Sequence, residues 1–187
     1  MNSTAAAVGR RRLTQRKAAL WLAIGFLAVP TVPLIFDVLL PERDWDTAEA
    51  VDKVDLVSED GHRIVVVPPD GWEIHDLGDV AVMRTDGVEV TVSIYDTFDR
   101  DPDQVAQRLM RANRVQGINS ALDGGHVATA DGSLSGDSCV VVTEESTGTC
   151  AYLVGDDVMV SVLAVADPDR SAPAIADVVA PITKGQS

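Results

Sequence analysis

Short apolar runs separated by turn residues dominate the chain after residue 55, and the clearest of them covers residues 88–95. In this run every second residue is Val or Ile, with Glu, Thr, Ser and Tyr between them. Alternation with a period of two places one set of side chains on the buried face of a strand and the other set on a polar face. A second apolar run, 80–85, precedes it, and the intervening Asp86-Gly87 is typical of a two-residue hairpin turn. Residues 80–95 are therefore predicted to form a β-hairpin.

Five more runs rich in β-forming residues predict strands over 63–67, 126–130, 138–143, 149–154 and 158–165. The first of these ends at Pro68. Because proline cannot donate a hydrogen bond to a neighbouring strand, this run is predicted to be an edge strand or the end of one. Turns are predicted between the later runs, at Gly124-Gly125, Asp131-Gly132 and 155–157.

Two helices are predicted within this strand-rich region. Asp101 is suited to be the N-cap of the first, Pro102 to its first position, and Gln104 to complete a capping box. Apolar residues then repeat at helical spacing until Gly117, a typical helix stop. An apolar stripe over 175–182 predicts a second, shorter helix near the C-terminus. Strands before, between and after two helices predict an α+β domain, an antiparallel β-sheet packed by two helices.

Residues 18–36 contain no charged side chain, and residues 38–40 extend this apolar stretch. At about 1.5 Å per residue, a 19-residue helix is roughly 28 Å long, close to the hydrocarbon thickness of a bilayer. We therefore predict a transmembrane helix over 18–40, which makes the membrane lipid bilayer the first partner of the chain. A cleaved signal peptide is the main alternative, but the exit from the stretch offers no Ala-x-Ala cleavage site. Whether the segment is ever cleaved stays open.

Five basic residues and no acidic ones precede the apolar stretch. Lys and Arg close to a membrane span are retained on the cytoplasmic side. Residues 1–17 are therefore predicted to be a cytoplasmic basic segment, 41–55 a charged linker with a short helix over 48–54, and 56–187 an extracytoplasmic domain. The predicted location is the cell membrane, with a single pass and a cytoplasmic N-terminus.

The net charge of −14 conceals a strong division along the chain. Residues 1–36 carry a charge of +5, whereas residues 37–187 hold 29 acids and 10 bases, a charge of −19. Binding to nucleic acid depends on clustered Lys and Arg, and no such cluster is evident after Lys17. We therefore expect no nucleic-acid partner. The acidic surface is either a solvated surface or a patch for a basic partner.

The only two cysteines, Cys139 and Cys150, lie in successive predicted strands. A loop of residues 143–146 would place them directly opposite each other, within reach of a cross-strand disulfide. A structural disulfide is predicted because the translocated compartment is oxidising. A turn centred on Ser146-Thr147 would shift the register and separate the two sulfurs. A redox pair is the functional alternative, but there is no Cys-x-x-Cys and no basic neighbour.

The sequence shows no legible catalytic, cofactor or metal site. Four aspartates lie within residues 96–103, but the spacing of an EF-hand loop fails, so these residues are interpreted as a helix cap and a polar loop, with an adventitious calcium site as the alternative. His62, His75 and His126 lie in separate segments without metal-ligand spacing. No Gly-x-Ser-x-Gly motif is present.

An apolar strand followed by a Pro/Gly turn and a tryptophan is a further local pattern, with the residues Pro68-Pro69-Asp70-Gly71-Trp72. With the order of elements over roughly residues 56–184, it resembles the PsbP-like and LpqN-like extracytoplasmic domains. The resemblance implies an antiparallel sheet packed by helices, a non-catalytic accessory or binding role, and an anchored protein of an actinobacterial envelope. The chain departs from the lipoproteins of this group because it has no lipobox cysteine. Trp72 is interpreted either as a core tryptophan or as a partner or ligand contact.

These features predict a non-enzymatic, membrane-anchored accessory or binding protein of the bacterial cell envelope, one that engages a membrane or envelope protein complex. The alternatives are a carrier or sensor of a small or lipidic ligand, which requires an apolar cavity between sheet and helix, and an enzyme with a dispersed site.

Overall fold

The structure is a computed structural model that describes residues 45–49 and 52–185. The predicted transmembrane helix, 18–40, and the cytoplasmic segment, 1–17, lie outside these residues. Within the described ranges, neither helix has the length and apolar character needed to cross a bilayer. From Trp45 onward the chain belongs to one compact unit.

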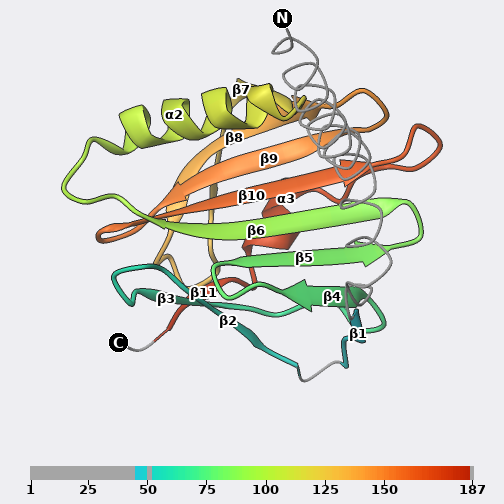
Figure 1. Cartoon of the computed structure of the whole chain (residues 1–187), viewed down its shortest axis with the longest axis horizontal. Helices are drawn as coiled ribbons and strands as arrows, with labels where there is room; N and C mark the ends of the chain where they lie inside the picture. The colour runs from blue at the N-terminus through green and yellow to red at the C-terminus, as the bar shows by residue number, and fades with distance from the viewer. Residues whose placement is uncertain (1–44, 50–51, 186–187) are drawn as a thin grey trace, which may run out of the picture. The chain divides into compact units, whose positions relative to one another are not determined.

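The prediction of an α+β domain is wrong, because the described chain is mostly β: eleven strands form two antiparallel sheets, accompanied by two short helices (Figure 1). Several strands form where the residue pattern predicted a linker or no regular element. Part of the predicted linker pairs with the large sheet as β1 (Asp46–Thr47), and β2 (Val54–Val57) begins inside it. The segment after Trp72 forms β4 (Glu73–Asp76), whose alternation is too short to be distinctive.

Eight strands form the large sheet, in the order β1-β4-β5-β6-β10-β9-β8-β7. The remaining members are β5 (Val80–Thr85), β6 (Val88–Asp96), β7 (Asn119–Ala128), β8 (Ser135–Val142), β9 (Thr147–Val154) and β10 (Val158–Ala166). The predicted hairpin over 80–95 is confirmed, since Thr85 pairs with Val88 across the turn. A small sheet has the order β11-β3-β2, with β3 (Arg63–Val66) in the centre and β11 (Thr183–Lys184) at one edge.

The first predicted helix is present as α2 (Pro102–Val115). The Asp101 side chain accepts a hydrogen bond from the backbone N–H of Asp103 at 3.0 Å, as expected of an N-cap. Gln104 instead donates its side-chain amide to the Asp101 carboxylate at 3.5 Å. Gly117, with a φ of +83°, follows the helix end. The second helix, α3 (Ile175–Val179), is a little over one turn long.

The two faces of the large sheet carry two separate apolar clusters, because side chains alternate along each strand. One face, here called the inner face, packs against the small sheet and α3 through fully buried side chains such as Leu56, Ile64 and Val179. The other, the outer face, packs against α2 around Val105, Tyr152 and Met159. Figure 1 shows α2 beside the β7–β10 end and the small sheet near β4 and β5.

Strand β7 contains an irregularity where a turn was predicted at Gly124-Gly125. The strand continues through these glycines, and its pairing with β8 shifts register between Leu122 and His126. Gly124 has a φ of +82°, which glycine adopts without strain. Hydrogen bonds from Ser138 Oγ (2.6 Å) and Gly125 N (2.8 Å) to Asp123 brace the bulge. They hold the pKa of the Asp123 carboxyl below its usual value, with the Ser138 hydroxyl as the larger cause.

A buried polar contact joins the small sheet to the large one. Ser58, just after β2, donates its hydroxyl to Asp96 at the end of β6 at 2.5 Å, and both residues are buried. The Asp96 carboxylate also accepts the backbone N–H of Asp60 at 3.1 Å. This aspartate therefore has a structural role in the loop that the sequence marked as carboxylate-rich.

Candidate functional site

The outer face of the large sheet is divided into two halves. On the β7–β10 half, α2 and the sheet enclose the second apolar cluster. On β4, β5 and the first part of β6, the outward side chains are exposed or half-buried, and this region is called the accessible half. It is formed by Glu73, His75, Val82, Arg84, Glu89 and Thr91.

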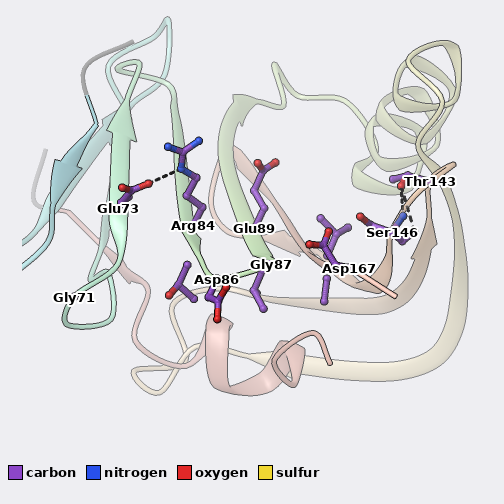
Figure 2. Close-up of a pocket in the computed structure, with 13 residues that line it drawn as sticks. Gly71, Glu73, Arg84, Asp86, Gly87, Glu89, Thr143, Ser146 and Asp167 are labelled. Carbon is purple, nitrogen blue, oxygen red and sulfur yellow. Dashed lines mark hydrogen bonds and ion pairs between the residues drawn. The ribbon is translucent and has the colours of Figure 1, made fainter. Parts of the chain in front are cut away.

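A row of charged side chains crosses the accessible half. Pairing between strands places Glu73 opposite Arg84, and Arg84 opposite Glu89. Arg84 Nε lies 2.6 Å from Glu73 Oε2, as the dashed line in Figure 2 marks. The guanidinium also stacks on the Trp45 ring, 3.7 Å from its centroid, and this ring lies 5.6 Å from the ring of His75. The sheet thus presents a fixed cation between two carboxylates.

The charged row forms one wall of a cleft of about 790 Å³. Its other walls are the β5–β6 turn, the end of β10 and the β8–β9 turn (Figure 2). Gly87 has a φ of +75°, and a Cβ on it would lie 2.9 Å from Asp167 Oδ2. Because Gly87 has no side chain, the β5–β6 turn can lie directly against the end of β10. The cleft, here called the acidic cleft, is lined by Gly71, Glu73, Arg84, Thr85, Asp86, Gly87, Val88, Glu89, Thr143, Ser146, Val165, Ala166 and Asp167.

Negative charge predominates in the acidic cleft. Its lining contains the carboxylates of Glu73, Asp86, Glu89 and Asp167 against the single guanidinium of Arg84. Outside the lining, Arg170 forms an ion pair with Asp86. Such a surface attracts a cationic group and disfavours an anionic one. Its lining offers carboxylates and hydroxyls but neither histidine nor cysteine.

A second hollow, the helix groove, lies between α2 and the sheet and has a volume of about 370 Å³. Ala106 and Met110 line it from the helix, and Tyr152 and Met159 from the sheet. His126 and Asp137 also line it, with His126 Nδ1 3.5 Å from Asp137 Oδ1. The groove is therefore mainly apolar beside Ala106 and Met110 of the helix and Tyr152 and Met159 of the sheet. It is polar where β7 meets β8.

Tyr152 lies beneath α2 with 3% of its surface exposed. Burial raises the pKa of its phenol above the usual value, and nearby Ser120 and Asn113 partly oppose this rise. Its hydroxyl completes no hydrogen bond of good geometry with any described residue. The side chain therefore acts as part of the apolar cluster.

The predicted disulfide between Cys139 and Cys150 is confirmed. The two residues are directly paired between β8 and β9, with a Cα–Cα distance of 4.8 Å. Val142 pairs with Thr147, so the loop is residues 143–146, as the symmetric register required. Both cysteines are fully buried in the cluster beneath α2.

The other residues considered in the sequence lie apart from one another. Trp72 is half-buried and packs against the inner-face core, while Gly71 and Glu73 on either side of it line the acidic cleft. His75 belongs to the accessible half and His126 to the helix groove. Across the described ranges, no three His, Cys, Asp or Glu side chains are grouped closely enough to hold a metal ion.

The charged row was not found from the sequence, although part of its signal was present. A two-residue turn at Asp86-Gly87 pairs Arg84 with Glu89 by symmetry. Glu73 could be placed beside Arg84 only if β4 had been predicted as a strand. Asp167 lies more than 70 residues away from Arg84 along the chain. Residues so distant are brought together only by the strand order.

Comparison of the chain with protein-family models, characterised proteins and solved structures found no match. The resemblance to PsbP-like and LpqN-like domains therefore stays a prediction.

Proposed function

We propose that this chain is a non-catalytic accessory protein of the bacterial cell envelope, anchored in the membrane by residues 18–40. Its extracytoplasmic domain engages a membrane or envelope protein partner. The observation that carries this proposal is the acidic cleft, which presents four carboxylates from separate strands and turns around one arginine. The partner that fits it is a protein segment bearing Lys or Arg.

The arrangement of the cleft supports binding in two ways. Glu73 and Arg84 retain about half of their side-chain surface, 48% and 45%, so both remain available to a partner. The strands hold these groups in a fixed register, which lowers the ordering cost of association. Charges at such a rim mainly speed encounter and select the partner.

Neutralising the cleft is expected to weaken capture of the partner. The test variant is Glu73→Gln with Glu89→Gln in the full chain, and covalent crosslinking in intact membranes is the measurement. Loss of two rim charges should reduce crosslinked product about fivefold or more, because each such contact contributes on the order of 0.5–1 kcal/mol.

The matched control is Glu59→Gln with Asp177→Asn, which removes the same charge from exposed positions outside the cleft. It should leave the crosslinked product unchanged. The role of the cleft would be contradicted if both double variants crosslinked as well as wild type. It would also be contradicted if both lost crosslinked product to the same extent.

The helix groove favours a second candidate function, a carrier or sensor of a small apolar ligand. Ligand sites commonly have volumes of roughly 300–1,000 Å³ with mostly apolar walls, and the groove lies where this function requires a cavity, between sheet and helix. Ala106→Phe should fill the groove, whereas Ala112→Phe places the same ring on the exposed side of α2. Native mass spectrometry of the full chain should detect a bound small molecule in wild type and Ala112→Phe but not in Ala106→Phe. A wild-type chain without such a molecule would rule this candidate out.

A further inference from the structure

Three arginines lie on the solvent side of α2, at Arg108, Arg111 and Arg114. A spacing of three residues on a helix keeps side chains on neighbouring turns of one side. All three are exposed, and the helix contains no acidic residue after Asp103. Two uncharged residues separate each of these arginines from the next along the chain, so they become a cluster only once the helix is oriented by its buried side. They are called the arginine ridge.

Several basic side chains of the described domain are paired with acidic ones, whereas the three of the ridge are not. Four other basic residues form ion pairs with carboxylates: Arg63 with Asp55, Arg84 with Glu73, Arg170 with Asp86, and Lys184 with Asp156. Within the described part of the chain, the ridge arginines form no ion pair. Arg111 donates only to the side-chain oxygen of Gln107, at 3.3 Å. The ridge therefore keeps its positive charge for an external anion.

The position of the ridge on the fold favours one kind of anion. Trp45, the first described residue, stacks on Arg84 of the outer face, and α2 packs on that same face. The predicted membrane span ends at residue 40, so only residues 41–44 separate it from Trp45. Four residues reach at most roughly 14 Å when fully extended. If residues 18–40 span the bilayer, as in the proposed function, this short tether keeps the domain within reach of lipid headgroups.

We propose that the arginine ridge binds the phosphate groups of anionic lipids and turns the exposed side of α2 toward the bilayer. This proposal rests on the anchor in the proposed function. Guanidinium groups bind phosphate oxygens through paired hydrogen bonds. Val115, 88% exposed at the end of the ridge, adds an apolar contact for the interface.

The test uses the full chain reconstituted in vesicles, with a fluorophore on Gln104→Cys and nitroxide-labelled lipid headgroups as quenchers. Strong quenching is expected in vesicles containing phosphatidylglycerol and weak quenching in pure phosphatidylcholine. Each basic contact at an anionic surface strengthens binding about fivefold, so losing three should cost roughly a hundredfold. The triple variant Arg108→Gln, Arg111→Gln, Arg114→Gln should therefore be quenched no more in phosphatidylglycerol than in phosphatidylcholine.

The control variant Lys53→Gln, Arg63→Gln, Lys184→Gln removes three charges on or beside the small sheet and should keep the wild-type quenching. Quenching that ignores lipid charge, or that survives in the ridge variant, would overturn the proposal, as would crosslinking of the ridge to an acidic protein in place of lipid. Carbonate extraction tests the membrane anchor separately from the ridge. A chain that washes off the vesicles removes the anchor and the proposed function with it, whereas an anchored but unquenched chain removes the ridge proposal only.

Discussion

Gly148→Ala is expected to lower the free energy of unfolding by about 3 kcal/mol and the melting temperature by roughly 10 °C. A Cβ at position 148 in β9 would lie 1.9 Å from the carbonyl oxygen of Ala164 in β10 and 2.8 Å from Val165 Cα. These atoms are backbone, so they move only if the β9–β10 pairing yields. Because β10 lies between β9 and β6, a distortion there reaches the centre of the sheet.

Thermal unfolding followed by circular dichroism measures this effect. Thr147→Ala is the control, since residue 147 is the exposed neighbour in the same strand, and it should change the melting temperature by little. Gly136→Ala should behave like Gly148→Ala, because its Cβ would lie 1.9 Å from the carbonyl oxygen of Tyr152. A Gly148→Ala chain as stable as wild type would show that the two strands are less closely apposed than described.

Replacing both Cys139 and Cys150 by alanine is expected to cost about 3 kcal/mol of stability. The bridge closes a loop with a sequence separation of 11, which restricts the unfolded chain. Both sulfurs are also fully buried beneath α2, so the replacement removes packing near Val105 as well. Denaturant unfolding of the oxidised wild type and the double variant provides the comparison.

Reduction gives an independent measure of the same bridge. Reductant should lower the wild-type unfolding midpoint and leave the midpoint of the double alanine variant unchanged. Equal midpoints for oxidised wild type and the double variant would show that the disulfide adds nothing to stability. Crosslinking through the acidic cleft should survive in the double variant below its melting temperature, since neither cysteine lines the cleft.

Local patterns in the sequence predicted the elements that carry their own signals. The alternation over 88–95 and the Asp101 cap led to β6 and α2, and the symmetry about residues 143–146 led to the disulfide pairing. The predicted number of strands was too low, and the predicted α+β fold class was therefore wrong. The two consecutive glycines of β7 were interpreted as a turn because glycine permits both a turn and a bulge.

The candidate sites were harder to predict because they depend on strand order. Glu73, Arg84 and Asp167 lie on different strands or turns, and only the order of neighbouring strands in the sheet, β4-β5-β6-β10, brings them together. The arginine ridge depends on which side of α2 is buried. The disulfide differs from both, since its register is set by one short loop between adjacent strands.

The bulge in β7 has a further consequence for the behaviour of the protein in solution. Among the described strands, β7 is the last in the large sheet, and Leu122, Val140 and Val142 on this strand and its neighbour are 55%, 45% and 48% exposed. A long, straight edge strand beside exposed apolar side chains would invite a second copy to add its own strand and begin a fibre. The displaced residues around Gly124 divide that border into two short stretches, 119–122 and 126–128. The bulge at Gly124 is thus expected to hinder edge-to-edge pairing between two copies of the chain.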